Sequence, residues 1–253
     1  MVISILTFNV WFSEYYRNER IKEIIRIIME NKPTIICLQE VINETLSIIL
    51  ENDFIKKNYE TSIKELNRVY GELILYSKKT KVNISNIHRF SLTRMERHIN
   101  HIELELGSKK LNIITAHLES DFKYEWIKLN QLEEMLLNFT KNKNVIYAGD
   151  TNMSNKVEKE YNNLLEKYSY KDAWIEMNKK IKYDELKYTY DGKMNNNIKG
   201  RYRNRLDRVI YKLADFGFCE FELVGKEERV KTLKGDICPS DHFGIIFTIN
   251  GVN

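Results

Sequence analysis

The chain has 253 residues, 43% of them hydrophobic, which is enough to bury the core of one large domain. A formal net charge of +4 permits a polyanionic partner without requiring one. No run of about 18 uncharged apolar residues occurs, which argues against a membrane-spanning helix.

Apolar periodicity predicts helices and strands that alternate along the chain. The predicted strands cover residues 3–9, 34–38, 73–76, 101–106, 111–118, 144–148, 206–212 and 244–249. The predicted helices cover residues 17–29, 45–50, 125–139 and 157–168, and the third should bury Trp126, Leu129, Leu132 and Leu136. A charged segment should join the last two strands, and the Asn-rich residues 194–198 should form a loop. This alternation favours sheet layers covered by helices in a single domain over residues 1–253.

Three cysteines are scattered through the chain without metal-ligand spacing, at Cys37, Cys219 and Cys238. We expect reduced thiols in an intracellular protein, nuclear or cytoplasmic. A strand pattern begins at once at the N-terminus, so no signal peptide is expected.

An acid and an amide follow the predicted strand 144–148. Gly149 should turn the chain so that Asp150 and Asn152, two residues apart, lie on one rim. Such a pair suits general-base catalysis, in which Asp150 takes a proton from a water molecule that Asn152 holds. The structural alternative is an Asx turn, which Gly149 would accommodate.

Two other strands end in polar residues suited to a hard metal ion. Glu40 emerges where the strand 34–38 leaves the core, and Asn9 ends the strand 3–9. Mg²⁺ prefers oxygen ligands and keeps several waters, so one or two carboxylates suffice. Alternatively, Glu40 begins a surface helix near its positive end, and Asn9 is a turn residue.

The segment Ser240-Asp241-His242 directly precedes the last predicted strand. A histidine there can stabilise charge on a pentacovalent phosphorus, and Asp207, at the start of another strand, can orient it. Alternatively, His242 is a loop residue and Asp207 pairs with Arg208. Polar clusters at four strand ends together predict a metal-assisted hydrolase of phosphate esters.

Basic residues alternate between positions 199 and 208. Alternation would direct Arg201, Arg203 and Arg205 to one face, near Tyr202, where they could contact a nucleic-acid backbone. A solvated edge strand explains the same pattern. His117, at the end of a predicted strand, would by itself be a satisfied core residue, and we expect His88, His98 and His101 to be structural.

Six motifs occur in the order typical of the endonuclease/exonuclease/phosphatase superfamily. They are Thr7-Phe8-Asn9, Leu38-Gln39-Glu40-Val41, Thr115-Ala116-His117-Leu118-Glu119-Ser120, Gly149-Asp150-Thr151-Asn152, Arg205-Leu206-Asp207-Arg208 and Pro239-Ser240-Asp241-His242-Phe243-Gly244. The third and fourth motifs, with Thr189-Tyr190-Asp191 and the asparagines after Met194, resemble the branch that removes tyrosine from 5′ phosphates of DNA. The resemblance covers nearly all of residues 1–250.

The resemblance implies a fold and a set of roles. The fold would be a four-layer, DNase I-like α/β sandwich of two sheets with helices on the outer faces. Mg²⁺, for which Mn²⁺ is expected to substitute, would be held by Glu40, Asn9 and Asp241. Asp150 with Asn152 would activate water. The scissile phosphate would contact His117, Ser120 and His242, with Asp207 bracing His242.

The resemblance also implies substrate contacts and a partner. Tyr70 and Arg97 would contact the departing phosphotyrosine, and Tyr190 and Leu206 would support the first bases. Further substrate contacts are expected at Asn195, Arg201, Arg203 and Arg205. The partner would be a single-stranded or frayed DNA 5′ end with a tyrosyl or peptide adduct, or an RNA end. A monomer that binds no membrane is expected.

Some residues depart from the family pattern. Trp11 stands where an Asp is usual, so we expect a single functional Mg²⁺. Ser154 replaces an Arg that grips substrate. Tyr190 and Leu206 replace a Trp and a Phe, which should weaken base stacking.

Other functions of the same fold remain open. An abasic-site endonuclease or DNase usually has a Lys shortly after the Gln-Glu pair, whereas this chain has Val41-Ile42-Asn43, and Thr151 also argues against it. Phosphoinositide phosphatases and sphingomyelinases lack the motif at residues 115–120. The remaining alternative is a catalytically silent module that binds nucleic-acid ends.

Overall fold

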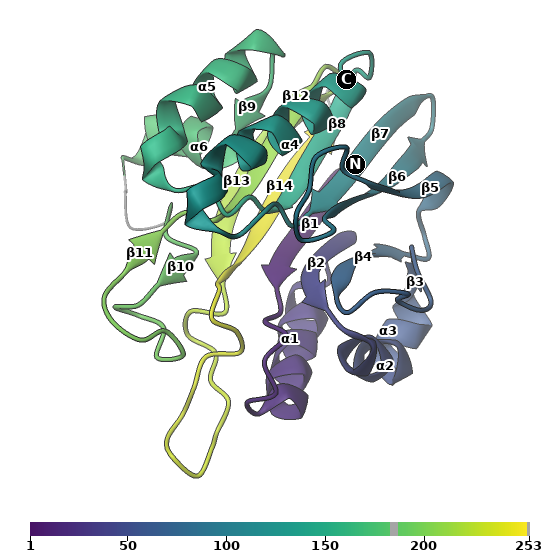
Figure 1. The fold of residues 1–253 in the computed structure, drawn as a ribbon. Coiled ribbons are helices and arrows are strands. Elements are labelled where there is room, and N and C mark those ends of the chain that lie inside the picture. The colour runs from purple at the N-terminus through teal and green to yellow at the C-terminus, as the bar shows by residue number, and fades with distance from the viewer. Residues whose placement is uncertain (183–186, 252–253) are drawn as a thin grey trace.

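Two six-stranded sheets lie at the centre of the described chain, residues 1–182 and 187–251, in the computed structural model (Figure 1). The first has the order β13 (Phe216–Val224), β14 (Gly244–Gly251), β1 (Val2–Asn9), β2 (Ile35–Val41), β4 (Gly71–Ser77), β3 (Tyr59–Thr61). The second has the order β5 (Lys81–Arg89), β6 (His98–Leu106), β7 (Lys109–Ala116), β8 (Asn144–Asp150), β12 (Asp207–Leu213), β9 (Lys171–Asp172). A separate ribbon pairs β10 (Tyr190–Asp191) with β11 (Arg203–Asn204).

Helices cover the outer faces of both sheets. The first sheet packs against α1 (Arg17–Asn31), α2 (Asn43–Glu51) and the short α3 (Asp53–Asn58). The second packs against α4 (Glu125–Asn138) and α5 (Glu158–Lys167), which follow the 3₁₀ turns η1 (Phe122–Tyr124) and η2 (Asn155–Val157). The remaining helix, α6 (Ala173–Ile181), contributes Ala173 and Met177 to the core between the sheets. None of the helices in the described ranges combines the length and apolar composition needed to cross a membrane.

Three hydrophobic clusters fill the three interfaces between these four layers. Along β1, Ile3 and Ile5 face the second sheet, whereas Leu6 and Phe8 face the helices of the first. A strand buried on both faces reads as a continuous apolar run, which is why its pattern was detectable in the sequence. The expected two-sheet α/β sandwich with helices outside is confirmed.

Every helix and strand expected from periodicity is present, but several elements were missed. Strand β5 is exposed along almost its whole length and so carries no apolar signal. Strand β13 lies within the expected charged connection, and a register shift between Phe218 and Glu220 interrupts its alternation. The expected buried face of α4 was partly wrong, because Trp126 is 54% exposed while Lys128 and Gln131 are buried.

The polar ends of four strands meet at one end of the sandwich. Asn9 ends β1, and its parallel neighbour β2 places Gln39 beside it. Asp150 ends β8 and lies opposite Asp207, the first residue of β12. The expected turn at Gly149 was wrong, since this residue lies within β8. A Cβ at Gly149 would come within 2.4 Å of the Ala116 carbonyl oxygen, so a glycine allows β7 and β8 to approach closely here.

Candidate active site

Asp150 lies at the centre of the polar site and is 1% exposed. Its Oδ2 accepts a hydrogen bond from Asn9 Nδ2 at 3.0 Å and lies 3.4 Å from His117 Nε2 and 3.9 Å from His242 Nε2. Its Oδ1 accepts from the backbone N–H of Asn152 at 2.8 Å. Burial raises the pKa of Asp150 to about 6, and the nearby Asp207 acts in the same direction.

Asp207 orients His242 toward this centre. His242 Nδ1 donates to Asp207 Oδ2 at 2.7 Å, which leaves Nε2 facing Asp150. The backbone N–H of Asp207 donates to Thr189 Oγ1 at 3.0 Å, which fixes the start of β12. Burial alone would lower the pKa of His242, but the carboxylates, Asp207 foremost, raise it well above the ordinary value. His242 is therefore a cation at neutral pH.

Glu40 approaches the same centre from β2 in a left-handed conformation with a φ of 60°. Its two oxygens accept hydrogen bonds from Asn9 Nδ2 at 3.2 Å and from the backbone N–H of Phe12 at 3.1 Å. Burial raises the pKa of Glu40. Burial also raises the pKa of Asp241 to about 6, with Glu40 adding to the rise. A non-glycine residue held at positive φ is typical of functional sites, where surrounding contacts maintain the strain.

These residues have the charge balance of a cation site. The phosphate-site cluster, as we term it, contains four carboxyl groups but only one protonated imidazole, in Glu40, Asp150, Asp207, Asp241 and His242. Oxygen donors around an excess of negative charge match the preference of Mg²⁺ or Mn²⁺. Asp150, Asp207 and His242 each place a ligand-type atom within 4.8 Å of the others. Because Asp207 already holds His242 Nδ1, this trio is better described as an oriented acid–histidine pair than as a free ligand set.

His117 lies inside the site, not in a hydrophobic core apart from it. It is 3% exposed, and among the described residues its Nδ1 has no hydrogen-bond partner and lies 3.9 Å from Glu40. Burial, followed by the positive charges of Arg97 and His242, lowers the pKa of His117 well below the ordinary value. His117 is therefore a neutral ring beside the cationic His242.

On one side of His117, Tyr70 and Arg97 form an aromatic–cation pair. The Arg97 guanidinium lies 5.2 Å from the Tyr70 ring, whose centre is 6.4 Å from the His117 ring and 5.7 Å from that of Phe12. Arg97 is 2% exposed, yet its Nε and Nη1 have no hydrogen-bond partner within the described residues. Such buried donors without a partner are uncommon in folded proteins.

Glu119 explains how Arg97 is placed. Its carboxylate accepts hydrogen bonds from Thr93 Oγ1 and from the backbone N–H groups of Arg94 and Met95, at 2.7 to 3.0 Å. Thr93 Oγ1 in turn accepts from the N–H of Arg97 at 2.8 Å. The motif at residues 115–120 therefore supplies both the site histidine and the anchor of the arginine loop.

On the other side of the cluster lies a cleft of about 620 Å³, here called the aromatic cleft. Its aromatic rings form a series that begins at His242. The distance between ring centres is 5.2 Å from His242 to Tyr190, 6.1 Å from Tyr190 to Tyr202, and 6.3 Å from Tyr202 to Phe122. The cleft is also lined by Ser120, Glu125, Asn152, Ser154, Lys156, Ile198, Lys199 and Leu206. Exposed rings with two lysines suit stacked bases and a phosphate backbone.

The basic residues between 199 and 208 do not form one exposed face. Arg205 is buried and pairs with Asp172 at 2.5 Å and Glu158 at 2.7 Å, while Arg208 pairs with Glu158 at 2.9 Å. We call these four residues the ion cluster. Arg203 pairs with Asp191 at 2.8 Å, and Arg201 stays exposed. The predicted ladder is thus wrong for Arg205, because its guanidinium is buried against two carboxylates and does not face solvent.

Three further residues of interest have structural contacts in the site. Asn195 is 1% exposed and donates to the Ser240 carbonyl at 2.9 Å, which braces the loop before His242. Trp11 packs against Arg20, whose guanidinium lies 4.5 Å from the ring and donates to backbone carbonyls, including that of Trp11. Ser154 caps η2 and lines the aromatic cleft.

Lys128 is a site residue that the sequence analysis missed. It is fully buried, and its Nζ donates to the Asn152 carbonyl at 2.9 Å and pairs with Glu125 at 3.5 Å. One turn later, Gln131 accepts from the N–H of Glu119 at 3.0 Å. Helix α4 therefore positions two loops of the site. Polar residues on the apolar face of the helical pattern were the available signal.

Comparisons with known proteins identify the family of the chain. The family model described as "Endonuclease/Exonuclease/phosphatase family" matches residues 6–242. Human tyrosyl-DNA phosphodiesterase 2 is 26% identical over 156 residues, covering 60% of this chain and 42% of that protein. The chicken protein of the same name is 25% identical over 138 residues, covering 53% and 37%. The chain thus spans about two fifths of the length of these relatives.

Solved structures share the fold. The Danio rerio TDP2 complexed with single-strand DNA product is 24% identical, with a TM-score of 0.83, covering 98% of this chain and 99% of that one. A Caenorhabditis elegans TDP2 structure is 22% identical, with a TM-score of 0.82, and the match covers 98% of this chain and 74% of that one. A Bacteroides thetaiotaomicron mannosyl-6-phosphatase is 14% identical, with a TM-score of 0.71, and the match covers 99% of this chain and 100% of that one. Since that protein is named for a sugar phosphate, the fold alone does not identify the substrate.

Proposed function

The chain belongs to the endonuclease/exonuclease/phosphatase family, and on that premise we propose that it hydrolyses the bond between a tyrosine and the 5′ phosphate of DNA. Tyrosyl-linked RNA 5′ ends are a second proposed substrate, and the protein would act as a monomer in DNA repair. The similarity to tyrosyl-DNA phosphodiesterase 2 of human, rat and chicken supports this proposal.

Asp150 is the proposed general base. Because its pKa is about 6, the carboxylate is mostly ionised at neutral pH and can take a proton from an attacking water. The oxygen of that water bonds to phosphorus while the bond from phosphorus to the tyrosine oxygen breaks. The products are a 5′ phosphate and a free tyrosine. Asn152, held by Lys128 at its carbonyl, would orient the water.

The histidines and Ser120 would hold the phosphate during this step. His242 carries a positive charge that Asp207 maintains, so it can stabilise charge on the phosphoryl oxygens. His117 is neutral and can donate a hydrogen bond without competing for the base. We assign Mg²⁺, or Mn²⁺, to Glu40, Asn9 and Asp241, where it would neutralise charge on the phosphate.

One observation favours tyrosine over other leaving groups: the Arg97 guanidinium lies beside the Tyr70 ring. The Arg97 cation would attract a departing phenolate while the phenolate ring lies near Tyr70. A phenol has a pKa near 10, so it leaves more readily than a sugar hydroxyl and needs no strong acid. On the other side, Tyr190 and Leu206 in the aromatic cleft would support the first bases.

Turnover of matched oligonucleotides tests this proposal. We expect Mg²⁺-dependent cleavage of a 5′-tyrosyl end, with Mn²⁺ also active and a chelator abolishing the reaction. The comparison substrates carry a 3′-tyrosyl group or an abasic site at the same salt concentration. Faster cleavage of either would place the protein among the nucleases of the family. Binding without turnover of any substrate would identify a silent module.

A further inference from the structure

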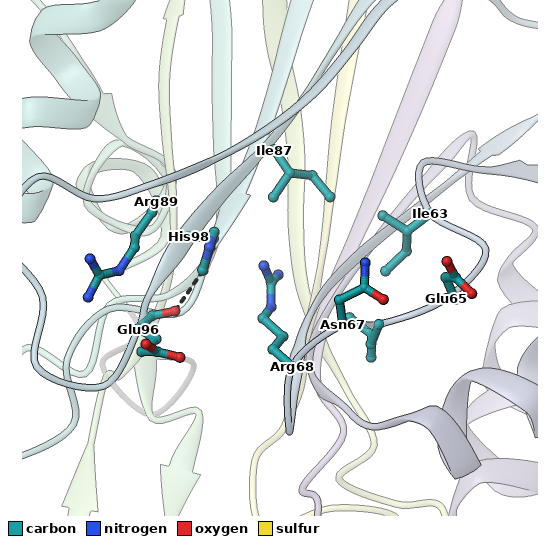
Figure 2. Close-up of a pocket in the computed structure, with 9 residues that line it drawn as sticks. Ile63, Glu65, Asn67, Arg68, Ile87, Arg89, Glu96 and His98 are labelled. Atoms are coloured by element: carbon teal, nitrogen blue, oxygen red, sulfur yellow. Dashed lines mark hydrogen bonds between the residues drawn. The ribbon is translucent and has the colours of Figure 1, made fainter.

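A second hollow lies beside Tyr70 and Arg97, away from the aromatic cleft. It has a volume of about 440 Å³ and lies between residues 63–68, which precede β4, and the adjoining ends of β5 and β6 (Figure 2). We call it the β4–β6 pocket. Figure 1 shows β3, β4 and β5 on the opposite side of β1 and β2 from the β10–β11 ribbon that carries Tyr190.

Residues that line the pocket are neighbours of Tyr70 and Arg97 along the chain. Arg68 lines it and donates from Nε to the Tyr70 carbonyl at 3.1 Å, while its Nη2 pairs with Glu72 at 2.7 Å. Gly71 makes room for this arginine, since a Cβ there would come within 2.5 Å of the guanidinium. Glu96 and His98, which flank Arg97, line the opposite wall. The two chain segments that carry Tyr70 and Arg97 therefore also contribute to the pocket.

Its lining is mixed in a way that suits a polypeptide better than a nucleic acid. Ile63, Leu66 and Ile87 are apolar, so they can pack against a side chain of a polypeptide but offer no contact to a phosphate backbone. Arg89 is exposed at the rim, and none of the ion pairs among the described residues includes it. Strand β5 is the edge of its sheet, so its outer backbone groups can pair with an extended chain.

We propose that the β4–β6 pocket binds the polypeptide that flanks the linked tyrosine, with an apolar side chain on Ile63 and Ile87 and an acidic side chain on Arg89. This proposal rests on the proposed function, because the tyrosine must leave on the side of Arg97. It assigns the preferred substrate as a DNA–peptide adduct whose tyrosine has acidic neighbours, in preference to a single tyrosine.

Three oligonucleotides of one sequence test the assignment. The 5′ phosphate carries a single tyrosine, a heptapeptide with acidic and apolar residues around a central tyrosine, or the same peptide with lysines in place of the acids. We expect kcat/KM for the acidic peptide to exceed that for tyrosine by about fivefold to tenfold, and no such gain for the lysine peptide.

Substitutions at the pocket should change only the peptide preference. Arg89→Glu should reverse the order of the two peptides, and Ile87→Asp should reduce the gain for the acidic peptide. The matched control is Lys141→Glu. Lys141 is exposed and precedes the start of β8, at the opposite end of that strand from Asp150. None of these changes should alter turnover of the single-tyrosine substrate.

The outcomes separate this assignment from the proposed function. Equal kcat/KM for all three substrates, or a preference that Arg89→Glu leaves unchanged, overturns the pocket assignment while the tyrosyl activity stands. No cleavage of the single-tyrosine substrate or of either peptide substrate by the wild-type protein overturns both. A gain for the acidic peptide that Arg89→Glu reverses and Lys141→Glu preserves supports the assignment.

Discussion

Strand β12 contributes to two buried charged clusters with opposite electrostatic character. In the ion cluster, two arginines face two carboxylates. Although burial alone would raise the pKa of Asp172 and of Glu158, the arginines hold both below their ordinary values. In the phosphate-site cluster, burial raises the pKa of Glu40, Asp150 and Asp241. Matched charges stabilise the fold, whereas the unmatched carboxylates are the ones to which we assign a cation and a substrate.

Replacing the proposed base should give the largest effect. Asp150→Asn should lower kcat about 10⁴-fold on a 5′-tyrosyl oligonucleotide, because the amide cannot take a proton from water. Circular dichroism should show an unchanged fold, since the amide can still accept from Asn152. The matched control is Asp172→Asn in the ion cluster, which should affect stability more than turnover. Substantial turnover by Asp150→Asn would transfer the role of base to another residue.

Breaking the ion cluster should affect folding instead. Arg205→Met leaves Asp172 buried without its closest cation, which should lower the free energy of unfolding by about 3 to 5 kcal/mol. Urea denaturation measures this loss. Arg97→Met is the comparison, because its guanidinium has unused donors: it should cost less stability but slow tyrosyl cleavage. Equal stability losses for both arginines would contradict the distinction between the clusters.

Removing a proposed metal ligand should lower turnover by about 10³-fold. Glu40→Gln keeps the shape of the side chain but removes charge that would hold Mg²⁺ and neutralise the transition state. Calorimetric titration of the wild-type protein should give one Mg²⁺ site, because Trp11 stands in place of an acid. Two cooperative sites would refute the single-metal prediction, and a Mg²⁺-dependent rate retained by Glu40→Gln would assign the ion to another acid.

Asp241 should limit the stability of the metal-free protein. Its folded pKa of about 6 lies above the ordinary 3.8, so the folded state binds more protons between these values. Stability therefore falls as pH rises from about 4 to about 6, and Asp241→Asn should remove a cost on the order of 3 kcal/mol at pH 7. Thermal unfolding in chelator across this range measures the difference. A variant no more stable than wild type at pH 7 would show that Arg20 already compensates the charge.

The smallest expected effect concerns affinity at the aromatic cleft. Ser154→Arg should lower KM for DNA about twofold to threefold with kcat unchanged, because the cleft already contains Lys156 and Lys199. Raising the salt concentration should reduce the gain. An unchanged KM would indicate that Arg201 or another exposed cation already supplies the contact.

The buried strands and the candidate catalytic residues were predictable because their signals are local. Strands β1 and β8 are buried on both faces and therefore read as apolar runs. Asn9 and Asp150 end these two strands. Edge strands such as β5 lie in solvent and carry no comparable pattern.

Taken alone, the sequence determined which residues end the strands of a two-sheet sandwich, because alternation and apolar runs are properties of neighbouring residues. Only the tertiary structure decided which charged side chains would be paired with side chains of opposite charge. Arg205 and Arg97 look alike in the sequence, yet Asp172 and Glu158 fill the donors of one while those of the other stay open. That difference depends on side chains brought together from distant strands and loops, which no local sequence pattern records.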